Sequence, residues 1–221
     1  MKFSKLIFKL KDYYKKLTVP QFTLITGLII IFLGTLILSL PICSFKNVGI
    51  WEAFFTATSA ITVTGLTVID IGNDLTVFGQ LFLALLLLSG GLGLMAITTF
   101  LQGFVVKGAK LRTRLDKGKT LDEFGVGGIG RTFKSIAITA ASIISIGAFI
   151  LYFFGFIDIE NNWERLWASI FHSISAYNNA GFSIWSSSMY EYRTNFIVNF
   201  VFICLIVLGG CLLYTSPSPR D

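Results

Sequence analysis

Long apolar stretches separated by short polar ones are the main feature of this chain. A bilayer core is crossed by roughly 20 mainly apolar helical residues, and four uncharged stretches have this length and character. They lie at 21–40, at 75–106, at 135–157 and from about 194 onward. Because the second is longer than one crossing requires, it is expected either to tilt or to extend beyond the membrane. The pattern predicts an all-α integral membrane protein.

Two further uncharged stretches, 53–69 and 166–190, are rich in Ser, Thr, Asn and Gly. They are too polar to face lipid, so they are either spans enclosed by protein or re-entrant segments that enter and leave on one side. Each is interpreted as a short helix followed by extended backbone. The helices are expected at about 51–60 and 164–176, with Asn161 or Asn162 as the N-cap of the second.

The distribution of charge decides between these alternatives. Residues 1–20 carry six Lys and one Asp, and residues 107–134 carry eight basic and three acidic residues. Both segments belong in the cytoplasm by the positive-inside rule, so an even number of crossings separates them. The stretch 53–69 is therefore predicted to be re-entrant. Segments 41–75 and 156–194 then lie outside, with three basic and seven acidic residues.

Composition excludes several classes of protein. Hydrophobic residues make up 54% of the 221 residues and charged residues 14%, which is too little polar surface for a soluble protein. Because the net charge of +6 reflects the topology, no nucleic-acid partner is predicted. The three cysteines are scattered and His172 is the single histidine, so neither a metal site nor a disulfide framework is expected. His172 itself is expected to pack or hydrogen-bond within the second short helix.

No enzyme is predicted either, since paired carboxylates and nucleophile–base sets are absent from the sequence. Gly125–Gly130 matches the GxGxxG pattern of dinucleotide sites. No strand precedes it, so it is interpreted as part of a flexible cytoplasmic linker.

An internal repeat relates the two polar stretches. A shift of 116 residues aligns them without a gap and pairs Trp51 with Trp167, Phe55 with Phe171, Ser59 with Ser175, Ala60 with Ala176 and Gly65 with Gly181. The predicted unit is span, pore loop, span, occurring twice in tandem. Five regions follow: a basic cytoplasmic segment 1–20, a first repeat 21–106, a basic Gly-rich linker 107–134, a second repeat 135–210, and an atypical tail 211–221.

The extended part of each loop predicts a cation filter. Extended backbone leaves carbonyl oxygens free to replace the water shell of a cation, and the preceding helix directs its negative C-terminal end to the same place. Glycine supplies positive φ, which helps to turn successive carbonyls toward one axis. The predicted ligands are the carbonyls of Thr62, Val63, Thr64, Gly65, Asn178, Asn179, Ala180 and Gly181. The Thr62, Thr64 and Asn side chains are expected to hold the loops in shape.

Several motifs together resemble the Trk/Ktr/HKT superfamily of potassium transporters, and most closely the membrane subunit of the bacterial Ktr-type system. They are ATSAITVTGLTVID (57–70), Gly79-Gln80, GGLG (90–93) and SAYNNAGFS (175–183), within about residues 18–210. The resemblance implies K⁺ uptake through four span–pore–span repeats, each with one critical filter glycine, here Gly65 and Gly181. K⁺ is then the permeating ion, with no covalently bound cofactor. It further implies a homodimer of full-length subunits, a cytoplasmic nucleotide-binding regulatory subunit, and a multi-pass place in the bacterial plasma membrane with a cytoplasmic N-terminus.

Only two of the four repeats are present, and the final SPSPRD is unlike the family. The chain is therefore interpreted as a truncated N-terminal half with a non-native tail from about 211, a short natural tail being the alternative. Two other functions stay open: an ion-coupled carrier for another solute, and a non-transporting membrane fragment. The carrier would need ionisable residues within its spans, and the predicted spans hold none that is firmly buried.

Overall fold

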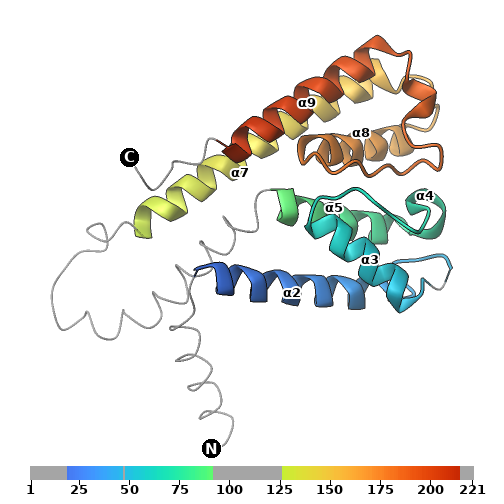
Figure 1. Ribbon diagram of the computed structural model, residues 1–221. Coiled ribbons are helices and arrows are strands. Elements are labelled where there is room, and N and C mark those ends of the chain that lie inside the picture. The colour runs from blue at the N-terminus through green and yellow to red at the C-terminus, as the bar shows by residue number, and fades with distance from the viewer. Residues whose placement is uncertain (1–18, 47, 92–125, 215–221) are drawn as a thin grey trace, which may run out of the picture.

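Helices make up the regular structure of the described residues. The computed structural model describes residues 19–46, 48–91 and 126–214 (Figure 1). In chain order the helices are α2 (Val19–Leu38), α3 (Ile50–Ile61), α4 (Ile71–Asp74), α5 (Val77–Gly91), α7 (Val126–Ile150), α8 (Asn162–Tyr177) and α9 (Phe196–Tyr214). Leu151–Gly155 continues α7 as a π-helical turn, and Tyr190–Tyr192 forms a 3-10 turn. This agrees with the all-α fold class predicted from the sequence.

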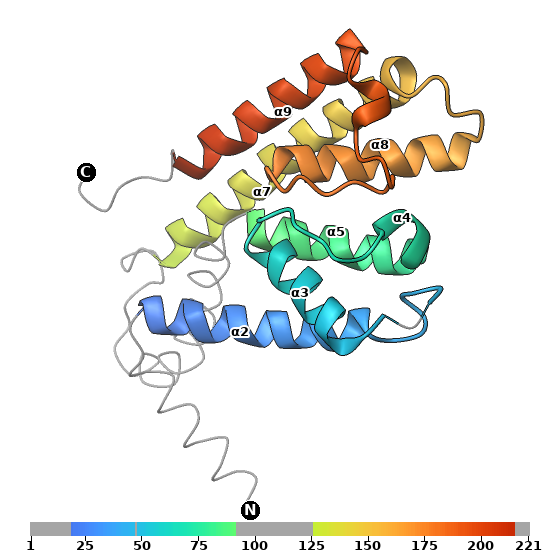
Figure 2. The same cartoon turned by 45° about the vertical axis from the view of Figure 1, so that its right-hand side comes forward.

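Two three-helix units follow one another along the chain. In the first unit α2, α3 and α5 pack against each other, and in the second unit α7, α8 and α9 do the same. Each unit therefore places a short helix, α3 or α8, against two longer ones (Figures 1 and 2). Contacts between α5 and α8 join the two units. Most of the buried apolar side chains form one continuous core that runs through both units.

The long helices differ in detail from the predicted spans. The stretch 21–40 is α2, which ends at Leu38, and the stretch 75–106 is α5 as far as Gly91, beyond which it lies outside the described residues. The third helix begins at Val126 and not near residue 135. Residues 126–130, predicted to be flexible linker, are thus helical. Each Gly costs a helix about 1 kcal/mol, but extending a helix that has already formed adds a hydrogen bond per residue.

Length and hydropathy single out one of the described helices as long enough to cross a bilayer, Lys134–Gly155. Thr23–Leu38, Val77–Gly91 and Phe196–Gly210 are shorter apolar helices. The other three predicted spans thus each contain a shorter apolar part of α2, α5 or α9 within the described residues.

Side-chain caps fix where several helices start. Asn161 Oδ1 accepts from the Trp163 backbone N–H at 3.0 Å, so Asn161 is the N-cap of α8. Thr76 Oγ1 accepts from the backbone N–H of Gly79 in the first turn of α5, at 3.2 Å. Asn195 Oδ1 accepts from the backbone N–H of Val198 in the first turn of α9, also at 3.2 Å. Helices α5 and α9 therefore begin in the same way, 119 residues apart.

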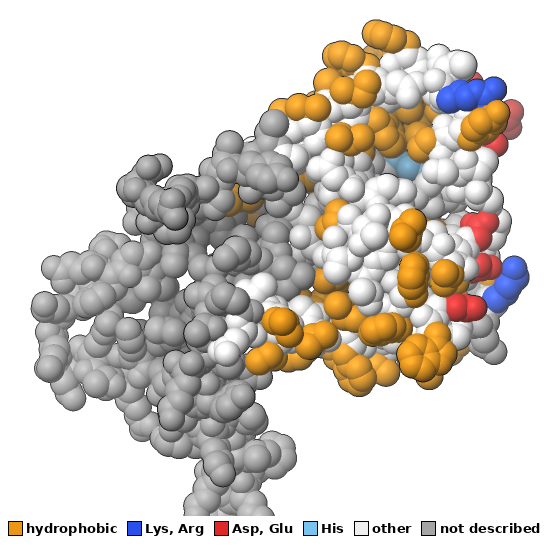
Figure 3. Space-filling model, viewed as in Figure 1, with side chains coloured by type: hydrophobic (Ala, Val, Ile, Leu, Met, Phe, Trp, Pro, Cys, Tyr) orange, Lys and Arg blue, Asp and Glu red, His pale blue; other side chains and the backbone are white. Residues whose placement is uncertain are grey.

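Charged side chains gather at one end of the molecule, over α4 and the connection that precedes α9 (Figure 3). Within the described ranges all charged side chains except those near the start of α7 belong to segments 41–75 and 156–194, the segments predicted to lie outside. Lys46 and Asp74 form an ion pair at 3.2 Å. Because the lysine is 77% exposed, this pair adds little stability, about 0–1 kcal/mol.

Candidate functional site

The two short helices end in the same way. Helix α3 ends at Ile61 and is followed by Thr62 with φ −83° and ψ −1°. Helix α8 ends at Tyr177 and is followed by Asn178 with φ −79° and ψ 1°. The non-helical stretches at these helix ends are named the first segment, 62–65, and the second segment, 178–181. They were predicted to be extended, but Thr62 and Asn178 keep near-helical angles and the residue after each has a positive φ. Each segment starts at the partial negative charge of a helix C-terminus.

Positive φ angles recur at equivalent positions of the two segments. Val63 has φ 54° and Gly65 has φ 82°, while Asn179 has φ 57° and Gly181 has φ 71°. Val63 and Asn179 are 116 residues apart, and so are Gly65 and Gly181, which is the spacing of the sequence repeat. A positive φ is unusual for a β-branched residue such as Val63, so the surrounding hydrogen bonds must hold it there.

Those hydrogen bonds also repeat. Thr64 N donates to Ser59 O and Ala180 N donates to Ser175 O, both at 2.9 Å. Val63 N donates to Ala60 O at 3.3 Å, and the equivalent bond from Asn179 N to Ala176 O measures 3.0 Å. The backbone N–H groups at the start of each segment are therefore turned back onto the end of the preceding helix.

One serine supports the far end of each segment. The Ser59 hydroxyl accepts from Leu66 N at 2.9 Å, and the Ser175 hydroxyl donates to Phe182 O at 2.7 Å. Both serines are buried. The sequence repeat pairs these serines but gives no role for them, because a conserved spacing does not show which backbone group a hydroxyl meets.

The carbonyl oxygens of the eight predicted ligand residues accept no hydrogen bond anywhere in the described part of the chain. Backbone carbonyls of folded proteins are normally paired with another protein group or with water. In each segment the first three N–H groups are paired while the carbonyl oxygens are not, so each segment has acceptors to offer to a cation. This is the property that a carbonyl-lined ion site requires.

The structure brings the two segments together. A Cβ placed on Gly65 would lie 2.2 Å from the Ala180 carbonyl oxygen, so the backbones touch there. A Cβ placed on Gly181 would lie 3.9 Å from the Gly65 Cα, so Gly181 also lies close to Gly65. Glycine at position 65 is therefore required both by its positive φ and by the close approach of the second segment.

Side chains of the two segments hold the backbone in place. The hydroxyls of Thr62 and Thr64 are 2.7 Å apart, and Thr62 Oγ1 also donates to Thr58 O. Asn178 Nδ2 donates to Ile174 O at 2.7 Å. With its amide oriented to suit both neighbours, Asn179 donates to Ile206 O and accepts from Gly210 N, each at 3.2 Å. The side chains thus bond within their own unit.

Glycines of α5 and α9 allow close packing under the short helices. A Cβ on Gly90 would lie 2.4 Å from Ile61 O, and one on Gly209 would lie 1.7 Å from Tyr177 O. Ile61 and Tyr177 are equivalent in the repeat. The second long helix of each unit, α5 or α9, therefore contacts the end of the short helix of that unit, α3 or α8, in the same way. Sequence reasoning missed this pairing because the glycines are 119 residues apart and not 116. The Gly-Gly pairs at 90–91 and 209–210 are the signal that identifies it.

His172 is buried, and its hydrogen-bond partners lie outside the second segment. Its Nδ1 lies 2.8 Å from Ala168 O, its Nε2 lies 3.0 Å from Ser183 Oγ, and its ring stacks on Trp185 with centroids 4.1 Å apart. This agrees with the predicted packing role. No group of three or more His, Cys, Asp or Glu side chains within the described ranges is arranged to hold a metal ion.

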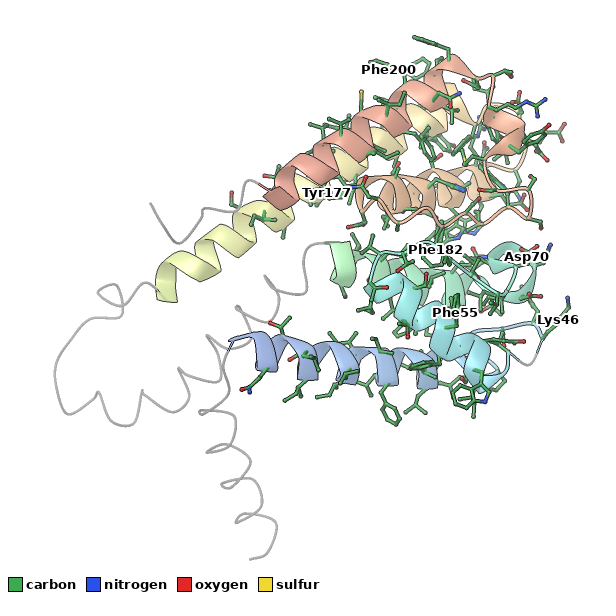
Figure 4. All side chains as sticks on the ribbon, in the orientation of Figure 1. Lys46, Phe55, Asp70, Tyr177, Phe182 and Phe200 are labelled. Atoms are coloured by element: carbon green, nitrogen blue, oxygen red, sulfur yellow. The ribbon has the colours of Figure 1, made fainter. Side chains whose placement is uncertain are left out.

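Asp70 links the two units on the charged side. Its carboxylate accepts from the backbone N–H groups of Gly72 and Asn73, at 3.0 and 3.1 Å, and from Asn73 Nδ2, which also bonds Ser186 Oγ. Burial raises the pKa of Asp70, but hydrogen bonds from Ser186, Asn73 and Gly72 outweigh burial and leave the pKa below its ordinary value of 3.8. The carboxylate is therefore charged at neutral pH. It lies at the same end of the molecule as Lys46 (Figure 4).

Comparisons with known proteins show which proteins this chain resembles. The chain is 37% identical to the Ktr system potassium uptake protein B of Bacillus subtilis, over 88% of this chain and 44% of that protein. It is 33% identical to the protein of the same name from Vibrio alginolyticus, over 86% of this chain and 42% of that protein. It is 32% identical to the potassium/sodium uptake protein NtpJ of Enterococcus hirae, over 90% of this chain and 45% of that protein.

The chain thus spans less than half the length of these curated relatives. Residues 8–213 match a family model described as a cation transport protein, TrkH. That match includes both three-helix units and both segments. The chain belongs to the TrkH family of membrane cation transport proteins.

Proposed function

We propose that this chain forms part of a pore that takes up K⁺ across the membrane, with the carbonyl oxygens of the first and second segments as ion ligands. The observation that carries the proposal is that all eight carbonyls lack a hydrogen-bond partner within the described residues, while N–H groups beside them are bonded. Two helix C-termini add negative potential at the same place. Three relatives are named as potassium uptake proteins, one of them as potassium/sodium.

Two segments alone do not surround an ion. They meet at Gly65 and Ala180 and leave the opposite side open. Since the relatives are more than twice as long as the matched part, we propose that two further units of the same kind complete the ring. Dehydrated K⁺ would then be bound by carbonyls from four sides, which replaces its water shell.

A pore explains the described helices better than an ion-coupled carrier does. Carriers of that class use ionisable side chains inside their spans. The described parts of α2, α5 and α9 contain no charged residue. Unpaired carbonyl oxygens lie instead on the backbone of the two segments, where a cation and not a proton is the natural ligand.

The topology and the partners proposed for this protein are those expected from its sequence. We propose a multi-pass protein of the bacterial plasma membrane, with the basic segments 1–20 and 107–134 on the cytoplasmic side. Residues 1–18 and 107–125 of these segments lie outside the described residues. A homodimer of complete subunits and a cytoplasmic nucleotide-binding regulatory subunit are proposed on the resemblance alone.

The proposal is tested by expressing the complete subunit in bacteria that lack their own K⁺ uptake. Growth at low K⁺ and uptake of K⁺ that excess Na⁺ does not abolish are the expected results. Thr64→Ala tests the role of the backbone, because the Thr64 hydroxyl bonds only Thr62. It is expected to cost about 1 kcal/mol of stability and to keep the preference for K⁺. Loss of that preference would show that the side chain, and not the carbonyl, is the ligand.

A further inference from the structure

The side chains of the first segment bond only close to themselves in the chain. Thr62 Oγ1 donates to Thr58 O, and the hydroxyls of Thr62 and Thr64 are 2.7 Å apart. Both threonines are exposed, and the residue between them is the apolar Val63. The side chains of the first segment therefore make no hydrogen bond to α5 or α9 within the described ranges.

The second segment, which lies between Tyr177 and Phe182 in Figure 4, has an asparagine in place of Thr62. This residue, Asn178, is 1% exposed and lies across Gly91 of α5. A Cβ placed on Gly91 would lie 1.9 Å from Asn178 Oδ1, 2.4 Å from its Cγ and 2.6 Å from its Cβ. The whole side chain thus rests on the backbone of the first unit, at a point where only glycine leaves room for it.

The Asn178 amide is held in this orientation by its own helix. Its Nδ2 donates to Ile174 O in the last turn of α8 at 2.7 Å, which directs Oδ1 toward Gly91. This oxygen is buried and has no hydrogen-bond partner in the described part of the chain. A buried acceptor without a partner lowers stability. The fold gains nothing from this oxygen, so its place against Gly91 points to a role in function.

Asn179, the equivalent of Val63, connects the second segment to α9. With its amide oriented to suit both neighbours, it donates to Ile206 O and accepts from Gly210 N, each at 3.2 Å. These two backbone groups have the spacing of the acceptor and the donor of one α-helical hydrogen bond. The amide therefore spans one turn of α9 with both of its polar atoms, which a valine at this position cannot do.

Helix α5 is joined to α8 at a second place, nearer its start. Trp167 on α8 donates its indole N–H to Gln80 Oε1 on α5 at 2.6 Å. Gln80 and Gly91 are eleven residues apart, which is about three helical turns. Because α5 is held on α8 at both places, Gly91 is a fixed surface for Asn178, and a displacement of α5 must move the second segment.

We infer that Asn178 and Asn179 are positioning residues for ion selection. Their side chains anchor the second segment to the backbones of α5 and α9 and so set where its four carbonyl oxygens lie. Selection between cations depends on the placement of such carbonyls. The first segment has no comparable side-chain link, so the two segments are unequal in how firmly they are held. The inference rests on the proposed function and deepens the role of the second segment in it.

Asn179→Gly in the complete subunit tests the link to α9. Glycine readily adopts the φ of 57° found here, so the change removes the amide and leaves the backbone conformation available. The ratio of K⁺ to Na⁺ uptake is expected to fall about fivefold, the equivalent of one net hydrogen bond. Asn199→Ala is the matched control, because the Asn199 amide also bonds backbone carbonyls, those of Tyr192 and Asn195, but at the other end of α9. It is expected to leave the ratio unchanged.

Gly91→Ala tests the link to α5 without changing the second segment. Its Cβ presses on Asn178, so the uptake ratio is again expected to fall about fivefold. Asn178→Gly removes all three atoms that this Cβ would meet, and Gly91→Ala is therefore expected to cause no further loss when added to it. Gly90→Ala is the control for specificity. Its Cβ would meet Ile61 O at 2.4 Å, and its effect is expected to be the same with and without Asn178→Gly.

The amount of each variant in the membrane and its thermal melting are measured alongside, since a purely structural role would lower these and leave the uptake ratio unchanged. An unchanged ratio in Asn179→Gly, or an equal loss from Gly91→Ala with and without the Asn178 side chain, overturns the inference. Asn179→Gly adds no atom, so it decides the outcome if Gly91→Ala fails to fold. No K⁺ uptake by the unchanged subunit would overturn the proposed function and this inference with it. Selective uptake by the unchanged subunit and by every variant would overturn the inference alone.

Discussion

Replacing Gly65 by Ser in the complete subunit is expected to weaken selection of K⁺ over Na⁺. Gly65 has φ 82°, and a Cβ at this position would lie 2.2 Å from the Ala180 carbonyl oxygen. The residue that carries this carbonyl is anchored on its other side, because Ala180 N donates to Ser175 O at 2.9 Å. The substitution therefore strains one proposed ligand segment and displaces a ligand of the other.

The structure sets the size of the effect. A left-handed conformation costs a residue other than Gly about 1–2 kcal/mol, and forcing extra atoms into a packed site costs about 1–3 kcal/mol. If about 1–2 kcal/mol of this total appears as lost preference for K⁺, the ratio of K⁺ to Na⁺ uptake falls about 5- to 30-fold. Gly65→Ala adds the same Cβ without a hydroxyl, so it is expected to act in the same direction.

The assay is competitive uptake of K⁺ and Na⁺ in cells that depend on the introduced subunit. Leu66→Ala is the control, since Leu66 adjoins the segment and its side chain is 60% exposed. Unchanged selectivity in both Gly65 variants, with normal amounts of protein in the membrane, would refute the assignment of the first segment as a filter. A loss in Leu66→Ala of the same size would show that any local change has this effect.

Two further predictions concern packing and pH. Gly209→Ala is expected to impair folding, because its Cβ would lie 1.7 Å from the backbone oxygen of Tyr177, whereas the Cβ of Gly210→Ala meets only the side-chain amide of Asn179, at 3.7 Å, and is expected to be tolerated. Comparable thermal stability of the two purified variants would contradict this. The lowered pKa of Asp70 means that its carboxylate stabilises the fold above pH 3.8, and that this contribution is lost as the pH falls through the lower pKa of the folded state. Thermal melting between pH 2 and 7 is therefore expected to show a smaller loss at acid pH for Asp70→Asn than for the unchanged chain, and parallel curves would argue against a role for Asp70.

Much of the local structure is predictable from the sequence. The short helices α3 and α8 were expected because polar, uncharged stretches repeat at a fixed spacing, and their ends agree with the expected ranges within a few residues. The same repeat places positive φ at Gly65 and Gly181, since glycine is the residue that adopts it most readily. Asn179 shares this conformation and gives a weaker sign of it, since Asn adopts a positive φ more readily than most residues other than Gly. Val63 shares it too but gives no sign, because β-branched residues rarely adopt it.

The register of the second long helices is not predictable in this way. The connection from Gly65 to Thr76 is three residues shorter than the equivalent connection from Gly181 to Asn195, so a single shift does not align both parts of the unit. Gly125–Gly130 is misleading for a different reason. Glycine favours turns locally, but the cooperativity of a long helix outweighs that preference over residues 126–130.

The sequence by itself determined the helical class, the polar stretches and the positions of the proposed ligands, since these depend on hydropathy and on residues close together in the chain. The tertiary structure alone decided that Gly65 meets Ala180, that Gln80 bonds Trp167, and that the carbonyls of both segments have no partner within the described ranges. These are contacts between residues 87 to 115 positions apart, or the lack of such contacts. They depend on how the helices pack against each other, which no local pattern encodes.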